Sequence, residues 1–285
     1  MRSWKKSWLI WISAGLLGGC ASDAWEAPDA AFLVVDSAAV TGSPDMVGSL
    51  RHEIEAVWIF DSAGFLGAFP LKRKVPVPMS SIGRLTLKAG VRESGMANAV
   101  TPYPFFQAVT VPFHPAPWQT DTFRPTFEYS PATRFWLLEN FEHGWSYWDV
   151  SEAAQATVGR AASPADVFEG DGTFEAHIQP HGLFEIITHD SFSFDTVRSS
   201  IYMELHYRTT TIMVIGAYFR QGNSRAQEAL IYLRPTQRWR KLYLNFTNLL
   251  SDLTDGTTVR FFIGGWDQDS TEDRVWLDNI KVLSF

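Results

Sequence analysis

Apolar and polar residues alternate along short segments of this chain, and this pattern predicts strands. Between residues 52 and 61, Ile54, Ala56, Trp58 and Phe60 occupy every second position. A period of two places these side chains on one face of a strand. Only residues 248–253 suggest a helix, and for one turn. We therefore expect an all-β protein.

The first part of the chain has the pattern of a small β-sandwich. We expect strands at residues 31–35, 52–61, 65–69, 84–88 and 106–113, with turns at Asp61-Ser62-Ala63-Gly64 and Ala89-Gly90. Short strands separated by turns at this spacing are typical of a sandwich. Residues 31–114 resemble the immunoglobulin-like or transthyretin-like modules common in surface lipoproteins of the Bacteroidota.

A proline-rich stretch follows the predicted sandwich. Pro115, Pro117, Pro125 and Pro131 are spread over residues 114–134. Proline fixes φ and lacks the backbone N–H that a strand needs for pairing. We therefore predict that residues 115–134 form an extended, irregular linker between two domains.

The second domain is predicted to span residues 135–285 and to form a jelly-roll sandwich. It shows many short alternating segments and no sustained helical period. We expect strands at residues 135–138, 174–179, 183–188, 200–208, 211–219, 229–233, 240–246, 258–264 and 274–283.

Three segments of this domain occur in a recognisable order. They are Leu138-Glu139-Asn140-Phe141-Glu142, residues 237–244 and Leu277-Asp278-Asn279-Ile280-Lys281-Val282. This order is similar to that of the galactose-binding-like jelly-roll superfamily, which includes many carbohydrate-binding modules. The resemblance implies the fold of the whole second domain.

The same resemblance implies a structural calcium ion. Its carboxylate ligands would be Glu142, or less favourably Glu139, together with Asp278. Calcium takes six to eight oxygen ligands, including backbone carbonyls of loops. The alternative is that Asp278 hydrogen-bonds a neighbouring loop without metal. No other cofactor is predicted.

The amino terminus has the pattern of a secretory signal. Arg2, Lys5 and Lys6 precede an apolar run over residues 8–17, and Leu17-Gly18-Gly19-Cys20 follows. The run is shorter than the roughly 20 residues that a membrane-spanning helix needs. The four residues resemble the lipobox of bacterial lipoproteins. An ordinary secretory signal with an incidental cysteine is the alternative.

The lipobox resemblance implies that residues 1–19 are removed and that Cys20 is acylated. Residues 20–30 are then expected to form a short tether. Acyl chains on Cys20 would hold the protein in a membrane. We expect a lipid anchor in the cell outer membrane. Whether the domains face the periplasm or the cell surface stays open.

Composition excludes several classes of function. The formal net charge is −7, and no basic cluster occurs beyond Lys72-Arg73-Lys74. Nucleic-acid binding needs concentrated positive charge, so it is not expected. Cys20 is the only cysteine, which excludes a disulfide within one chain and cysteine-based zinc sites. Nucleophile-elbow, Walker and dinucleotide glycine motifs are missing from the sequence, and we predict no enzyme activity.

Aromatic side chains give the strongest hint of a ligand. The chain holds 12 tryptophans, 8 tyrosines and 21 phenylalanines. Sugar rings stack on flat aromatic surfaces, while their hydroxyls take hydrogen bonds at the edge. The candidates at loops or strand ends are Trp145, Trp148, Tyr218 and Trp266, with Tyr147 and Tyr232 in the same group and Arg208, Arg220 and Gln221 as polar partners. Packing in a sandwich core is the alternative for each.

Two main functions are compatible with these features, and an accessory domain for a partner hydrolase is a third option. The first is a non-catalytic binding or assembly subunit that contacts another protein in an outer-membrane complex. The alternative is a carbohydrate-binding lipoprotein that captures polysaccharide through the jelly roll. Several aromatics lining one cleft beside polar groups would favour the glycan, and a flat apolar patch across both domains would favour a protein partner.

Overall fold

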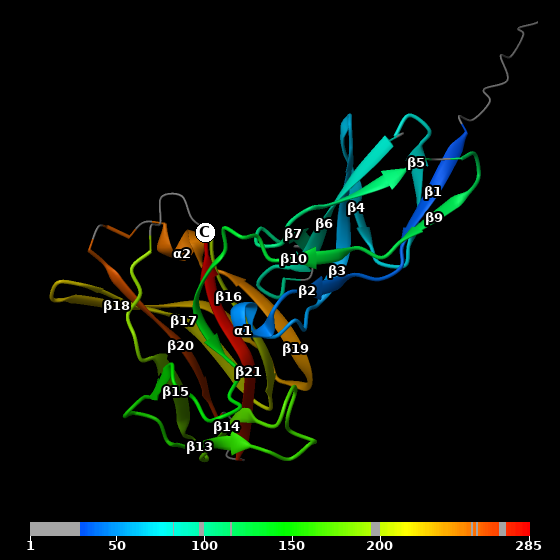
Figure 1. The fold of residues 1–285 in the computed structure, drawn as a ribbon. Coiled ribbons are helices and arrows are strands. Elements are labelled where there is room, and N and C mark those ends of the chain that lie inside the picture. The colour runs from blue at the N-terminus through cyan, green and yellow to red at the C-terminus, as the bar shows by residue number, and fades with distance from the viewer. Residues whose placement is uncertain are drawn as a thin grey trace, which may run out of the picture.

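The computed structural model describes residues 29–81, 83–96, 100–114, 116–194, 200–251, 253–254, 256–267 and 272–285. The chain folds into two β-sandwiches (Figure 1). Two four-residue helices accompany them, α1 (Pro44–Val47) and α2 (Thr247–Leu250). The all-β prediction is confirmed, and α2 overlaps the one helical turn expected from the sequence. Neither helix is long enough to cross a membrane, and the described residues hold no candidate span.

The first sandwich packs a three-stranded sheet against a sheet in which β3 and β6 are central. Its strands are β1 (Ala30–Val35), β2 (Ala39–Thr41), β3 (Ile54–Asp61), β4 (Gly64–Pro70), β5 (Lys74–Pro78), β6 (Gly83–Arg92), β7 (Val100–Pro102), β8 (Val109–Phe113), β9 (Thr120–Phe123) and β10 (Thr126–Glu128). The sheets have the orders β5-β1-β9 and β4-β3-β6-β7, with β8 also paired to β6. Leu33, Val57, Ile59, Leu85 and Leu87 meet in its core.

The proline-rich stretch is not an irregular linker, which corrects the prediction for residues 115–134. Strand β9 pairs in parallel with β1, and β10 pairs in parallel with β2. Pro125 lies between the two strands, where the missing N–H interrupts neither ladder. Phe127 on β10 is fully buried. The first domain therefore extends to residue 128 or beyond.

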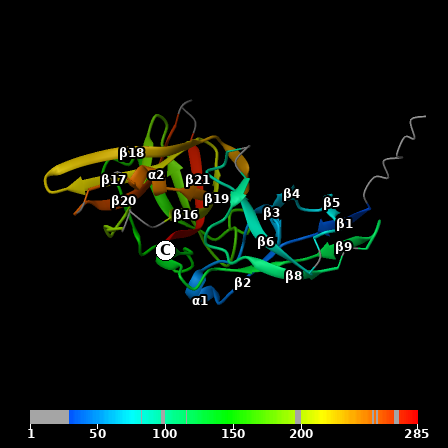
Figure 2. The ribbon, with the colours of Figure 1, turned by 90° about the horizontal axis from the view of Figure 1, so that it is seen from above.

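The second sandwich consists of two antiparallel sheets (Figures 1 and 2). Its strands are β11 (Arg134–Glu139), β12 (Trp148–Val150), β13 (Ala156–Ala161), β14 (Thr173–Ile178), β15 (Leu183–Thr188), β16 (Ile201–Thr209), β17 (Ile212–Gln221), β18 (Ser224–Leu233), β19 (Thr236–Asn245), β20 (Thr258–Trp266) and β21 (Asp273–Ser284). The six-stranded sheet has the order β13-β14-β21-β16-β19, with β11 also paired to β21. The five-stranded sheet has the order β12-β15-β20-β17-β18, so the jelly-roll prediction is confirmed.

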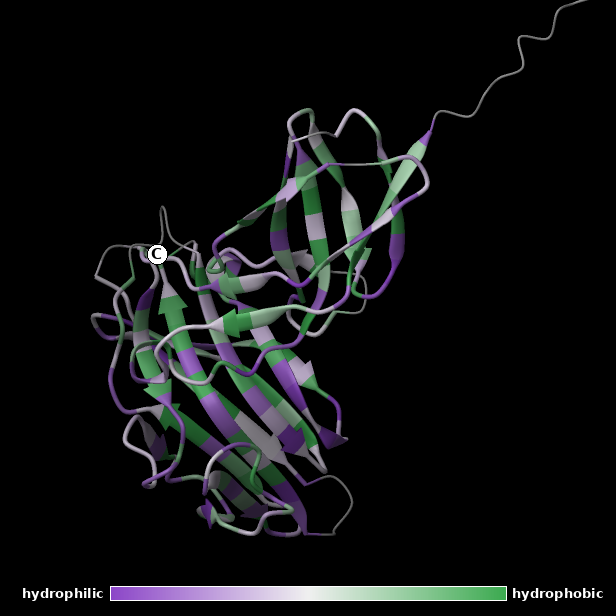
Figure 3. Cartoon of the chain, turned by 45° about the vertical axis from the view of Figure 1, so that its right-hand side comes forward, coloured by the Kyte–Doolittle hydropathy of each residue, from purple (hydrophilic) through white to green (hydrophobic). Residues whose placement is uncertain are grey.

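Hydrophobic and hydrophilic residues alternate along the strands of this sandwich (Figure 3). A strand has a period of two, so this alternation directs side chains to the inside and the outside in turn. Met203 and Leu205 on β16 are fully buried in the core between the sheets, as are Ile215 and Ile263 of the facing sheet. Along β21 the alternation breaks at Asn279, which has a positive φ of 51°. The pairing register between β16 and β21 shifts between Glu204 and His206, and this shift identifies a β-bulge in β21.

The first domain packs on part of the outer face of the six-stranded sheet, around β16, β19 and β21. Tyr202, Tyr243 and Leu283 of this face share a buried cluster with Tyr103 and Phe105 of the first domain, and other members of both domains complete it. This arrangement explains why β16 is buried on both faces. The five-stranded sheet lies on the side of the sandwich away from the first domain (Figure 2).

Candidate functional site

The outer face of the five-stranded sheet carries a groove lined by aromatic and aliphatic side chains. On β17, Met213 and Ile215 point into the core, so Val214 and Tyr218 point outward. The groove has a volume of about 440 Å³. Its side-chain walls include Leu183, Glu185, Val214, Tyr218, Gln227, Tyr232, Phe262 and Trp266.

Four aromatic rings form two neighbouring pairs in this groove. The ring centroids of Tyr232 and Trp266 are 6.2 Å apart, and the rings are nearly perpendicular. Those of Tyr218 and Phe262 are 5.2 Å apart. Tyr232 is 63% exposed, so most of its ring faces solvent. Phe262 is buried and Tyr218 and Trp266 are half-buried, so the apolar surface open to a ligand comes mainly from Tyr232, with parts of Tyr218 and Trp266.

A glycine makes room for one of these rings. A Cβ atom at Gly216 would lie 2.7 Å from two ring atoms of Phe262 and 2.1 Å from the backbone oxygen of Glu228. Only hydrogen fits at this position. Phe262 can therefore lie close over β17, where it supports Tyr218.

Glu185 holds polar groups at the edge of the groove. The hydroxyl of Tyr218 donates to this carboxylate, with distances of 3.0 and 3.2 Å to the two oxygens. The side-chain amide of Gln227 lies 3.4 Å from Glu185 Oε2. Burial, together with the negative charge of Glu185, raises the pKa of Tyr218 to about 12. These contacts orient the Tyr218 ring and keep hydrogen-bonding groups beside it.

A second groove of about 440 Å³ adjoins the first and shares Tyr218 and Glu185 with it. Its lining is basic: Arg220, Arg225 and Arg260 contribute to it, as does His189. Asp149 Oδ2 lies 3.0 Å from Arg260 Nη2, and Asp149 Oδ1 lies 3.0 Å from His189 Nδ1. The hydrogen bond with Asp149 raises the pKa of His189.

The sequence located part of this site. Tyr218 and Trp266 lie together in the aromatic groove, with Tyr232, while Arg220 lies in the basic groove. Phe262, Glu185, Gln227, Arg225 and Arg260 were missed. The alternation along each strand predicts that these side chains point outward. The sequence does not predict that the strands lie side by side in the order β15-β20-β17-β18.

Trp145 and Trp148 do not belong to the groove, which corrects the sequence prediction for both. Trp148 begins β12 and is only 3% exposed, within the hydrophobic core. Trp145 is partly buried against that core, with its ring centroid 5.3 Å from that of Phe174. Neither ring presents an open face at the groove.

The calcium candidates are engaged with protein groups. Asp278 Oδ2 accepts hydrogen bonds from Thr173 Oγ1 (3.0 Å) and from the backbone N–H of Glu169 (3.3 Å). Glu142 accepts the backbone N–H of Asp171, and Arg160 Nη2 lies 3.7 Å from it. Burial raises the pKa of Asp278 to about 7 despite its hydrogen bonds.

Glu139, the alternative ligand, instead holds the loop after β11 through the N–H groups of Phe141 and Ser146. Within the described ranges, no cluster of three or more histidine, cysteine, aspartate or glutamate residues is placed to hold a metal ion. Calcium therefore stays a prediction from resemblance.

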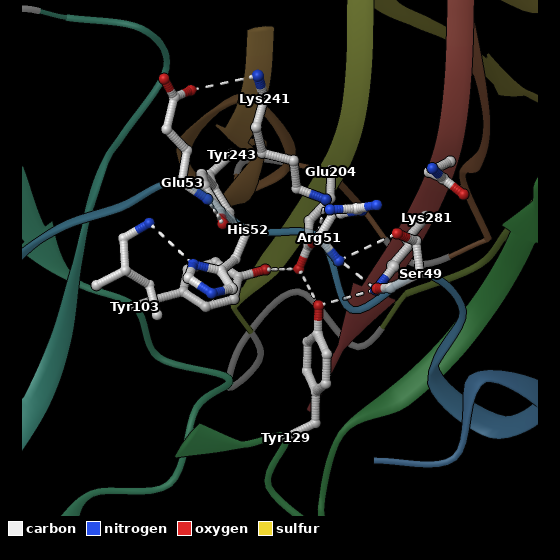
Figure 4. Close-up of polar contacts among 12 residues, drawn as sticks. Ser49, Arg51, His52, Glu53, Tyr103, Tyr129, Glu204, Lys241, Tyr243 and Lys281 are labelled. Carbon is white, nitrogen blue, oxygen red and sulfur yellow. Dashed lines mark hydrogen bonds and ion pairs between the residues drawn. The ribbon is translucent and has the colours of Figure 1, made fainter. Parts of the chain in front are cut away.

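A second polar cluster lies between the two domains (Figure 4). Glu204 on β16 is buried, and its carboxylate accepts hydrogen bonds from the hydroxyls of Tyr103 (2.6 Å) and Tyr129 (2.8 Å) of the first domain. Lys241 Nζ lies 2.7 Å from Glu204 Oε2, and Lys281 Nζ lies 3.9 Å from the same oxygen. Lys241 and Lys281 are nearly inaccessible to solvent.

Burial and neighbouring charges both shift the pKa values in this cluster. Burial alone would raise the pKa of Glu204, but Lys241 and Lys281 outweigh burial and lower it to about 2. Burial lowers the pKa of Lys281 to about 7, although Glu204 opposes this shift. Lys281 Nζ also donates to the backbone oxygen of Ser49 at 2.7 Å and lies 3.0 Å from the Tyr129 hydroxyl. The cluster joins the domains.

Cys20 and the predicted signal segment lie outside the described residues.

No family model matches the chain, and no curated protein matches it. Several solved structures are similar to it. A carbohydrate-binding module in complex with β-1,4-galactotriose is 14% identical, with a TM-score of 0.37 over 52% of this chain and 97% of that one. A family 11 carbohydrate-binding module of a Clostridium thermocellum cellulase is 12% identical, with a TM-score of 0.38 over 53% and 95%.

A further structure, from a study of carbohydrate-binding modules of the β-sandwich superfamily, is 15% identical. Its TM-score is 0.41 over 80% of this chain and 84% of that one.

Proposed function

We propose that this protein is a non-catalytic, lipid-anchored envelope protein whose second domain binds a carbohydrate chain. The site is the aromatic groove on the open face of the five-stranded sheet. The supporting observation is that Tyr218, Tyr232 and Trp266 line one groove with Glu185 at its edge.

The groove offers both kinds of contact that a sugar needs. Apolar C–H patches of a sugar ring stack on aromatic faces, and Tyr232 presents such a face to solvent. Sugar hydroxyls need hydrogen-bonding groups at the edge of the ring. The carboxylate of Glu185 and the side-chain amide of Gln227 supply an acceptor and a donor there.

The arrangement of apolar surface favours this function over an assembly subunit. A protein partner was expected to use an apolar patch that crosses both domains. The apolar cluster that the two domains share is buried between them, with Tyr243 and Leu283 at 1% and 0% exposure. The aromatic groove, in contrast, is open to a ligand.

Affinity electrophoresis of the full chain tests the proposal. Gels containing a panel of neutral and acidic polysaccharides should retard the protein in at least one case. The double substitution Tyr232→Ala and Trp266→Ala should remove the retardation, because it removes the exposed ring of Tyr232 and the half-buried ring beside it. Trp118→Ala is the matched control, since Trp118 is 62% exposed in the first domain. Unchanged migration in every gel, acidic polysaccharides included, would reject carbohydrate binding.

The location is proposed from the lipobox resemblance at Leu17-Gly18-Gly19-Cys20. Acyl chains on Cys20 would anchor the protein in the outer membrane, with residues 20–30 as a tether. Metabolic labelling with a fatty acid should mark the wild-type chain and not the Cys20→Ser variant. Mass spectrometry that finds an unmodified Cys20 at the mature amino terminus would contradict the anchor.

A further inference from the structure

The basic groove beside the aromatic groove contains two arginines that face each other across a hairpin. Arg220 on β17 and Arg225 on β18 are directly paired in register, and both line the groove. Like charges directly opposite in an antiparallel pair destabilise the sheet. A third arginine, Arg260 on β20, lines the same groove.

The nearby carboxylates do not neutralise this pair. Asp149 is engaged by Arg260 and His189, with 3.0 Å between the atoms in each case. Glu185 accepts hydrogen bonds from Tyr218 and Gln227. In the part of the chain that the structure describes, neither Arg220 nor Arg225 lies within ion-pair distance of a carboxylate. Arg220 Nε is 3.4 Å from the backbone oxygen of Gly222.

This excess of positive charge occurs on a protein whose formal net charge is −7. Guanidinium groups bind carboxylates and sulfates through paired N–H donors in a fixed geometry. An anion between Arg220 and Arg225 would replace their repulsion by two attractive contacts.

The basic and aromatic grooves share Tyr218 and Glu185, so one extended ligand can occupy both. We infer that the ligand is an acidic polysaccharide, whose anionic group binds Arg220 and Arg225 while a neighbouring sugar ring contacts Tyr218. The inference rests on the proposed carbohydrate function and adds the chemical class of the sugar. The anionic group is a uronic acid carboxylate or a sulfate ester.

Paired polymers that differ only in charge test the inference. Binding of the full chain is measured for polygalacturonate and its carboxyl-reduced form, and for dextran sulfate and dextran. We expect at least one acidic polymer to bind about tenfold more tightly than its neutral partner. The pair that shows the difference identifies carboxylate or sulfate as the preferred group.

Substitutions then locate the effect. Arg225→Gln should remove most of the tenfold preference, and Arg220→Gln should act similarly. Arg225→Lys keeps the charge and should retain part of the preference. Arg84→Gln is the matched control, because Arg84 is exposed on β6 of the first domain. Arg84→Gln should bind the acidic and the neutral polymers as the wild type does.

The outcomes separate the two proposals. Equal binding of acidic and neutral partners, unaffected by Arg225→Gln, would overturn the inference and leave carbohydrate binding intact. Failure to bind these polymers and every neutral polysaccharide would overturn both. Binding that extends to DNA and survives Tyr232→Ala with Trp266→Ala would indicate a general affinity for polyanions. That result also overturns the acidic-glycan inference.

Discussion

The two outer faces of the second sandwich both combine charged residues with aromatic rings, but only one of them is covered. The outer face of the six-stranded sheet meets the first domain, and its central charge, Glu204, has two lysines and two tyrosines as partners. The outer face of the five-stranded sheet is open, and its arginine pair has no such partners among the described residues. Coverage therefore distinguishes the structural cluster from the proposed binding site.

The difference is one of solvation. Removing a charge from water is costly unless opposite charges and hydrogen bonds replace the water. The interdomain cluster meets this condition, and the pKa of Glu204 falls to about 2 as a result. The open face is hydrated, and the proposed ligand would displace that water. Substitutions should therefore change folding stability on the covered face and ligand affinity on the open face.

The largest expected effect is that of Glu204→Gln. This change leaves the buried charges of Lys241 and Lys281 without their carboxylate, which should cost about 3–5 kcal/mol of unfolding free energy. Glu185→Gln is the control on the open face, where a loss within about 0.5 kcal/mol is expected. Denaturant unfolding measures both. Equal losses would show that coverage does not distinguish the two faces.

A smaller effect is expected for the tyrosines that contact each carboxylate. Tyr103→Phe removes a buried hydrogen bond to charged Glu204 and should cost about 1.5–3 kcal/mol. Tyr218→Phe removes the corresponding hydrogen bond to Glu185 on the open face, where water can replace the hydroxyl. Its cost should be about 0.5 kcal/mol or less. Thermal unfolding of the two variants provides the comparison, and a larger loss for Tyr218→Phe would contradict it.

The pH dependence of stability should also come from the covered face. The folded-state pKa of Glu204 is about 2 and its ordinary value is 4.5, so the contribution to stability is fully present above pH 4.5. It decreases as the pH falls toward 2, by about 1 kcal/mol at pH 3.5. The wild type should lose this amount relative to Glu204→Gln between pH 6 and 3.5. Parallel curves for the two proteins would be inconsistent with a depressed pKa.

The smallest expected effect concerns calcium at Glu142 and Asp278. A cation bound only by the folded state raises stability in proportion to the logarithm of its concentration, and it would favour the ionised form of Asp278. Millimolar calcium should then raise the Tm by about 2–4 °C for each kcal/mol of binding free energy, and chelator should reverse the change. Asp278→Asn serves as the control. A Tm that does not respond to calcium or chelator rejects the metal site.

The sequence determined the all-β class, the jelly roll and the sorting of side chains between faces. The alternation of Met203 and Leu205 with Glu204 and His206 placed two residue types on opposite sides of β16, because a strand has a period of two. The predicted strand bounds also placed Tyr218, Tyr232 and Trp266 near strand ends, which made them candidates for ligand binding.

Tertiary structure alone decided which outer face is covered and which strands are neighbours. Residues 120–123 and 126–128 form strands because β1 and β2 offer them backbone partners, which proline content does not reveal. Trp148 and Tyr232 both lie at strand ends, yet Trp148 is buried in the core and Tyr232 is exposed. They differ because burial depends on the packing of distant segments. Arg220 and Arg225 meet because a hairpin fixes their register. Local pattern sets the direction of a side chain, whereas contacts between distant segments set what it meets.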